Sequence, residues 1–422
     1  MNKKTLAALG AAVVLCVAAF AGVLLFKAFK GRGGAEAEAL PAGSFVVARV
    51  DFERLRRWSA WNSLKRLVQG DGDDAGSRAQ RLQTEWRGFV QRCGFDPLDR
   101  LDRIVGGGDR AILEGRSQND WLVHASGRVS RAELQRCIEQ VLQHDRGRLE
   151  PAQVEGRPVF TALSSGDSAG PRQVQLHLRE RTAFAAPTAY MPNALKVVYG
   201  DLPRLGQSEA VGRMFSRLSR DSFLAVVGDV AAVRARNQQT TNELVDDLVR
   251  ANPNVPDLTL ARQVVTGGLG VRTENGAVIA AARAQMENTN QARAFTAAVQ
   301  ALVQARRRDV LESVSSIQAM TQLSRMIPGQ NLEAEWQQID AAFVAARAVI
   351  EQGVRVEQDG DTVVLTLTVT AAQATAFEQG VRAVQRVVGS RGDRRPRDLP
   401  ESPIPGLRMP GVPQQRPMPM PL

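Results

Sequence analysis

The stretch DRIVGGGDRA, residues 102–111, is decisive because its glycines are compatible with two very different folds. Gly106, Gly108 and Ala111 match the G-x-G-x-x-A spacing of a dinucleotide-binding turn, in which the glycines open a helix whose amides meet a pyrophosphate. The residues after Gly108, DRAILEGRSQNDW, are too few and too interrupted for a helix before the next apolar run, WLVHASG. We therefore expect a bend or bulge between two paired strands, and no phosphate site.

The chain also contains an internal match. SFVVARVDFERLRR (44–57) matches SFLAVVGDVAAVRA (222–235), with an aspartate at the same place after the apolar strand, and RIVGGG (103–108) is echoed by QVVTGG (263–268). Each copy gives strand, helix, strand, strand, helix, strand, which is the ferredoxin-like order. The sequence therefore predicts an α+β fold of two ferredoxin-like repeats (βαββαβ type) with helical insertions, preceded by one transmembrane helix.

Composition shifts along the chain suggest six segments. They are an N-terminal transmembrane anchor (1–30), a linker (31–43), a first α+β repeat (44–186), a connector (187–221), a second α+β repeat (222–390) with a helical insertion (306–351), and a Pro/Arg-rich tail (391–422). The tail is rich in proline and has no apolar periodicity, so we expect it to be disordered.

The N-terminal apolar segment predicts a location. Residues 5–26, TLAALGAAVVLCVAAFAGVLLF, contain no charge and are long enough to cross the hydrocarbon core of a bilayer as a helix. A cleaved signal peptide, which has a shorter apolar region and a small-residue site close behind it, is the alternative. The short tail before residue 5 favours an N-inside orientation. We therefore expect a single-pass protein of the bacterial inner membrane with its body in the periplasm.

Cysteine and charge restrict the function classes further. Beyond the anchor the cysteines are Cys93 and Cys137, for which we expect two buried free thiols, with one disulfide as the alternative. The formal net charge is +10, but cations beside the apolar segment and in the tail supply most of it, which leaves residues 33–390 nearly neutral. Because phosphate neutralisation dominates nucleic-acid binding, a nucleic-acid partner is not expected.

Neither the serine-hydrolase pattern nor the histidines have the surrounding residues that catalysis or metal binding would need. GDSAG (166–170) fits G-x-S-x-G around Ser168, but a strand follows it, and no acid separates Ser168 from the downstream His177. His124, His144 and His177 are too scattered to predict a metal site.

Two acidic patterns also have ordinary explanations. DGDDAG (71–76) resembles the start of a calcium loop, yet Leu82 stands where the bidentate glutamate is needed. Asp96, Asp99 and Asp102 are each near an arginine and indicate turn and helix-end charges. The sequence therefore predicts no catalytic, cofactor-binding or metal-ligating residues.

The sequences LPAGSFVVARVDFERLRR (40–57) and GDLPRLGQSEAVGRMFSRLSRDSFLAVVGD (200–229), with the repeated glycine strand ends, resemble uncharacterised bacterial single-pass envelope proteins that have a duplicated α+β ectodomain. That resemblance implies no activity. We expect a non-catalytic envelope protein that contacts the inner membrane through residues 5–26 and binds or scaffolds an envelope protein partner. Lipid or small-molecule binding between the repeats, and a serine hydrolase using Ser168, are the alternatives.

Overall fold

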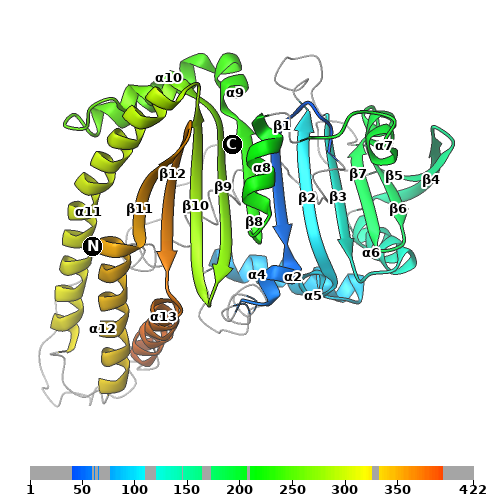
Figure 1. The fold of residues 1–422 in the computed structure, drawn as a ribbon. Coiled ribbons are helices and arrows are strands. Elements are labelled where there is room, and N and C mark those ends of the chain that lie inside the picture. The colour runs from blue at the N-terminus through cyan, green and yellow to red at the C-terminus, as the bar shows by residue number, and fades with distance from the viewer. Residues whose placement is uncertain are drawn as a thin grey trace, which may run out of the picture.

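The computed structural model describes residues 40–58, 61, 65, 77–109, 120–144, 146–163, 173–206, 210–325 and 332–392. Its strands form one twelve-stranded sheet in the order β11-β12-β10-β9-β8-β1-β2-β3-β7-β6-β5-β4 (Figure 1). The strands are β1 (Ser44–Asp51), β2 (Leu101–Asp109), β3 (Trp121–Gly127), β4 (Arg148–Val154), β5 (Arg157–Leu163), β6 (Gln173–Arg179), β7 (Thr182–Pro187), β8 (Leu224–Asp229), β9 (Val264–Glu274), β10 (Ala277–Met286), β11 (Val354–Asp359) and β12 (Thr362–Val369).

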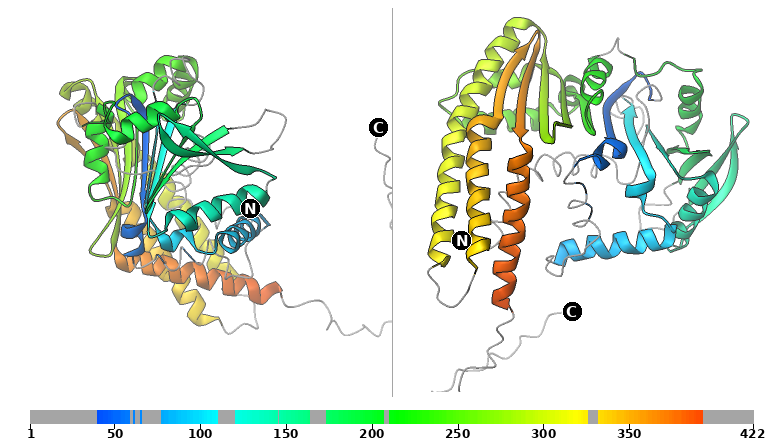
Figure 2. Two further views of the ribbon diagram at one scale, coloured as in Figure 1. Left: turned by 90° about the vertical axis from the view of Figure 1, so that its right-hand side faces the viewer. Right: turned by 60° about the horizontal axis from the view of Figure 1, so that its bottom comes forward.

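Helices pack on both faces of this sheet (Figure 2). They are α2 (Phe52–Arg56), α4 (Ser77–Cys93), α5 (Pro97–Arg100), α6 (Arg131–His144), α7 (Met191–Tyr199), α8 (Ala210–Ser219), α9 (Val230–Arg236), α10 (Gln238–Arg250), α11 (Thr289–Arg325), α12 (Glu333–Ala348) and α13 (Ala371–Gly392), with short helical segments η3 (Leu258–Gln263) and η4 (Val349–Gly353). In Figure 2, α11, α12 and α13 lie side by side and project away from the sheet as an arm.

The prediction of two ferredoxin-like repeats behind a transmembrane helix is wrong. A ferredoxin-like unit places another strand between the two strands that flank its first helix, whereas here β1 pairs directly with β2 and β8 pairs directly with β9, both antiparallel. The strand β8 pairs directly with β1, so strands from both sequence copies belong to one continuous sheet. The order of strands and helices was read correctly for most elements, but that order does not determine which strand pairs with which.

The described residues include no helix that is both long and apolar enough to cross a membrane. The transmembrane anchor predicted over residues 5–26 lies outside the described residues, as does the tail from residue 393, so the transmembrane helix of the fold prediction has no counterpart here.

Two strands, β4 and β7, were not predicted, because each contains proline and neither has a strong apolar alternation. The strand β4 forms an edge of the sheet, where a proline removes no obligatory ladder hydrogen bond. Together with β5 and β6, these strands extend the sheet outward from β3.

The matching segments around residues 44 and 222 occupy equivalent positions about the central strand pair. The match makes Ala48 equivalent to Val226, and these two residues pair at the middle of the β1–β8 ladder. Asp51 and Asp229 end the two strands, and each carboxylate caps the following helix, accepting from the backbone N–H three residues later at 3.0 and 2.8 Å. A local two-fold relation therefore connects β1 and β8.

The second sequence match is out of register with the structure. Ala48 pairs with Gly106, and the equivalent Val226 pairs with Leu269. Gly106 is therefore equivalent to Leu269, whereas the sequence match placed Gly106 with Thr266. A shift of three residues moves a side chain to the other face of a strand, so the glycine runs were matched on composition and not on position.

The glycines of 106–108 lie inside β2, and none of them has a positive φ. The strand continues to Asp109 and pairs antiparallel with β3, which confirms the expected fold-back but not a bend at the glycines. Instead, the missing side chain makes room: a Cβ at Gly107 would lie 3.1 Å from Ser44 Oγ and 3.3 Å from Leu40 Cδ1. Ala111, the last position of the motif, lies outside the described residues.

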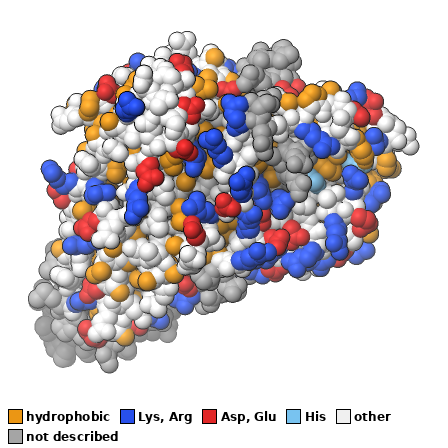
Figure 3. All heavy atoms as spheres, viewed as in Figure 1, with side chains coloured by type: hydrophobic (Ala, Val, Ile, Leu, Met, Phe, Trp, Pro, Cys, Tyr) orange, Lys and Arg blue, Asp and Glu red, His pale blue; other side chains and the backbone are white. Residues whose placement is uncertain are grey.

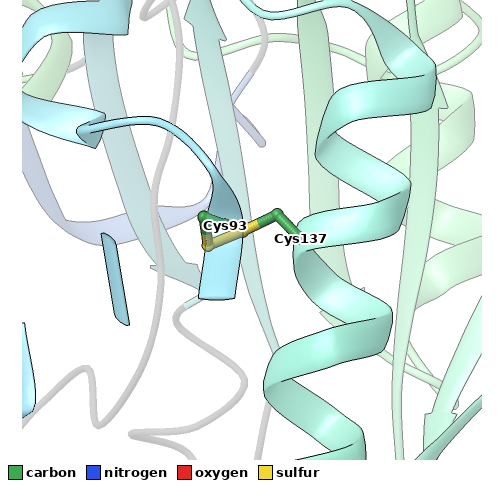
Figure 4. Close-up of a disulfide and its surroundings, with 2 residues drawn as sticks. All are labelled: Cys93 and Cys137. Atoms are coloured by element: carbon green, nitrogen blue, oxygen red, sulfur yellow. A yellow bond between two sulfur atoms is a disulfide. The ribbon is translucent and has the colours of Figure 1, made fainter. Parts of the chain in front are cut away.

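The expectation of free thiols is also wrong. Cys93 at the end of α4 and Cys137 in the middle of α6 form a disulfide, which is shown in Figure 4. Both residues are buried, with 8% and 4% of their surface exposed. The bond fastens α4 to α6 across a chain separation of 44 residues.

Candidate functional site

The helix α8 rests unusually close to the sheet because β9 carries glycine beneath it. A Cβ at Gly268 would lie 2.6 Å from Leu218 Cδ1 and 3.1 Å from Met214 Sδ. These two side chains belong to the apolar core between α8 and the central strands. The glycine therefore determines how closely α8 packs on β8 and β9.

A hollow of about 180 Å³ opens beside α8, on the side of β10 and β12. It is lined by Arg213, Met214, Arg217, Arg283, Gln285, Asp361 and Thr362. The two α8 arginines are four residues apart and so share one helix face. The two β10 residues are two apart and so share one sheet face, and Gln285 pairs in register with Thr362. We call this set the α8 hollow.

One carboxylate inside the α8 hollow is held in place. Gln285 Nε2 donates to Asp361 Oδ2 at 2.9 Å, and Thr362 Oγ1 donates to Asp361 Oδ1 at 3.0 Å. The backbone N–H of Met286 donates to the carbonyl oxygen of Asp361 at 2.9 Å, which fixes the main chain at the same point. Asp361 is thus an oriented acceptor with lone pairs left on both oxygens.

Positive charge predominates around that carboxylate. Arg283 Nη1 donates to Asp359 at 3.2 Å on the rim, where the Asp359 side chain is 61% exposed. Arg217 is exposed and makes no ion pair with any residue that the structure describes. Among the described residues that line the hollow, three arginines stand against one aspartate, and this excess of positive charge suits an anionic group.

The other side of α8 carries a second arginine group, centred on Asp51. Arg49 donates to Asp51 at 2.5 Å and to the carbonyl oxygen of Ser219 at 2.8 Å, while Arg103 Nε lies 3.6 Å from the same carboxylate. Burial, and then the charge of Arg103, lower the pKa of Arg49. Because Ser219 ends α8, this network ties the end of β1 to the C-terminal end of that helix.

Two of the three histidines are brought together, and neither has the surroundings of a metal ligand. His124 on β3 stacks on Phe184 at 3.8 Å between ring centroids, and His177 lies 6.1 Å from the same ring. Burial, with a smaller contribution from Arg179, lowers the pKa of His124 to about 3. His177 contacts Tyr199 Oη at 2.8 Å, and burial lowers its pKa as well. His144 ends α6.

The interpretation of Asp96, Asp99 and Asp102 as turn and helix-end charges is confirmed. Asp96 caps α5 by accepting from the backbone N–H of Leu98 at 2.9 Å, Asp99 pairs with Lys65 at 2.5 Å, and Asp102 pairs with Arg56 at 2.6 Å. Ser168 and the loop 71–76 lie outside the described residues.

Nothing in the described residues points to catalysis. No group of three or more histidine, cysteine, aspartate or glutamate side chains within them could hold a metal ion. The described residues that line a larger hollow, of about 680 Å³, all lie between 304 and 316 on α11.

Comparisons with known proteins do not assign a function. No protein-family model matches the chain, and no curated protein matches it. The chain is similar in structure to TP0453: crystal form III has a TM-score of 0.37 at 9% sequence identity over 82% of this chain and 98% of that one, and crystal form I has a TM-score of 0.36 at 10% identity over the same shares. Likeness at this level supports no argument about site or activity.

The residues of the α8 hollow were not singled out from the sequence, although a signal was present. Arg283 and Gln285 stand at alternate positions of an otherwise apolar strand, AVIAAARAQM, and so mark one polar face at its end. α8 lies in the predicted connector (187–221) and β10 in the predicted second repeat (222–390). What the sequence did not show was that α8 packs over β9, which brings the two elements together.

Proposed function

We propose that this chain is a non-catalytic binding protein that holds or scaffolds a protein partner on the face carrying α8. The observation that carries the proposal is the α8 hollow, a net positive recess built from a helix and two strands around an oriented carboxylate. Lys and Arg side chains gather across the middle and lower part of this face (Figure 3). Interfaces of this kind use arginine for oriented contacts with a partner's acidic groups.

The proposed location is an oxidising compartment outside the cytoplasm, such as a periplasm. The disulfide between Cys93 and Cys137 supports this location, because such bonds persist where thiols are not kept reduced.

Photo-crosslinking in cells tests the function. A p-benzoylphenylalanine residue replaces Ser216 on α8, which is partly exposed and does not line the hollow, or, as a control, Val344 on α12, whose side chain is 65% exposed. We expect one protein to crosslink at position 216 and not at position 344, and the purified partner to bind the unmodified chain. No adduct at 216, or equal adducts at both positions, would refute the proposal. Ser168→Ala is expected to leave partner capture unchanged.

A further inference from the structure

We propose that the α8 hollow binds a carboxylate from an acidic segment of the partner protein. This inference rests on the proposed function and specifies the chemistry of the contact. Its first support is the donor set. Arg213 and Arg217 reach the hollow from α8, and Arg283 reaches it from β10, so guanidinium groups face it from two elements. A guanidinium presents paired N–H groups that match the two oxygens of a carboxylate.

The size of the hollow favours a side chain over a free cofactor. Sites for small molecules and cofactors usually enclose about 300–1,000 Å³. The α8 hollow encloses about 180 Å³, which is enough for one side-chain group at the end of a segment that lies across the surface. The ligand is thus a part of a larger partner.

Asp361 offers the bound segment an oriented acceptor. Its carboxylate faces the same hollow as the three arginines and is held there by Gln285 and Thr362. The remaining lone pairs of Asp361 can accept a backbone N–H of the bound segment, which orients it.

The hollow is particular to this half of the sheet. Ala48 and Val226 are equivalent, and positions can be counted outward from them along the paired strands. Counted in this way, His124 in β3 occupies the position that Arg283 occupies in β10. Arg179 likewise stands where the second half has Asp359, because these residues pair with Thr182 and Thr362 at equivalent turns. The first half therefore places an arginine beside a neutral, buried histidine where the second half has an arginine–carboxylate pair.

Fluorescence anisotropy with the full chain tests the inference. The probe is fluorescein-labelled hexaglutamate, and hexaglutamine with the same label is the uncharged control. The variant Arg213→Gln/Arg217→Gln removes two lining charges. The variant Arg148→Gln/Arg250→Gln removes two exposed charges on β4 and α10, where these side chains are 73% and 74% exposed.

We expect hexaglutamate to bind, the lining variant to weaken it at least about tenfold, and the control variant to weaken it less than about twofold. Equal weakening by both variants would show nonspecific attraction and overturn the inference, as would the absence of binding. Displacement by millimolar inorganic phosphate would show a phosphate site. Displacement by free glutamate at the peptide's own concentration would show an amino-acid site.

The two proposals fail separately. If a partner crosslinks at position 216 but its affinity is unchanged by Arg213→Gln/Arg217→Gln, the binding function stands and the carboxylate contact is refuted. If hexaglutamate binds as expected and no partner crosslinks at 216, the hollow recognises carboxylates but the proposed function is refuted.

Discussion

The variant Gly212→Ala tests whether close packing holds α8 in place. Glycine inside a helix is normally unfavourable, and replacing it with alanine stabilises an exposed helix by about 1 kcal/mol. At position 212 the added Cβ would overlap the backbone carbonyl oxygen of Gly206, which cannot move aside as a side chain can. Overpacking of this kind costs about 1–3 kcal/mol. Because the gain of about 1 kcal/mol offsets part of this cost, we expect the free energy of unfolding to fall by up to about 2 kcal/mol.

The matched control is Gly88→Ala in α4, where the nearest atom to the new Cβ is Arg92 Nη1 at 3.2 Å, the end of a flexible side chain. Here alanine is expected to stabilise by about 0.5–1 kcal/mol. Urea unfolding followed by circular dichroism measures both changes, and hydrogen exchange of residues 210–219 shows whether α8 loosens. If Gly212→Ala is as stable as Gly88→Ala and α8 keeps its protection, the close approach does not position the helix.

Three further changes follow from buried contacts. Replacing Cys93 and Cys137 with serine opens a loop of 44 residues and is expected to cost about 4 kcal/mol, measured as a lower urea midpoint that dithiothreitol no longer changes. Asp51→Asn keeps an acceptor for the cap of α2 but leaves Arg49, whose side chain is 12% exposed, without its charge partner, and is expected to cost about 3 kcal/mol in the same assay. His124 has a folded pKa of about 3, below its unfolded value of 6.5, so its neutral form stabilises the fold above pH 6.5 and this stability is lost as the pH falls. Between pH 6.5 and pH 5 the loss is about 2 kcal/mol, and His124→Gln should remove that part of the pH dependence.

Each of these predictions has a result that contradicts it. Equal midpoints for the wild type with and without dithiothreitol would show that the disulfide does not stabilise the folded chain. A neutral effect of Asp51→Asn would show that Arg49 reaches water when its partner is lost. An unchanged pH slope in His124→Gln would place the acid sensitivity in other groups, of which His177 is one, since burial lowers its pKa too.

The local elements could be predicted from the sequence because their signals are local. β1 begins where the segment SFVVARVDFERLRR begins, β3 coincides with the apolar run WLVHASG, and Asp51 caps a helix as its position after a strand suggests. Pairing could not be predicted in this way, because an antiparallel meander and a split β-α-β unit can share one order of strands and helices. The proline in β4 argues against a strand in the sequence. The strand forms nevertheless because β4 lies at the edge of the sheet, where proline is tolerated.

The α8 hollow could not be predicted for a related reason: its residues come from segments that only the sheet register brings together. The same register shows that both halves pack a serine and a leucine side chain against a strand glycine. A Cβ at Gly107 would contact Ser44 Oγ and Leu40 Cδ1, and a Cβ at Gly270 would contact Ser222 Oγ and Leu218 Cδ2. The match that aligns residue 44 with residue 222 also aligns residue 40 with residue 218, so glycine, serine and leucine recur as a unit.

Because the glycine, serine and leucine recur in both halves, we assign them a role in packing, and we assign the proposed binding to the arginines of α8. In the first half the leucine of the unit, Leu40, fills the space over β2, whereas in the second half Leu218 belongs to a helix that continues over β9 and carries Arg213 and Arg217 to the edge of β10. The glycines permit the packing in both halves, but among the described residues it is the second half that forms a charged recess. We therefore look for the proposed binding on the arginine face of α8, and not at the glycine motif that the two halves share.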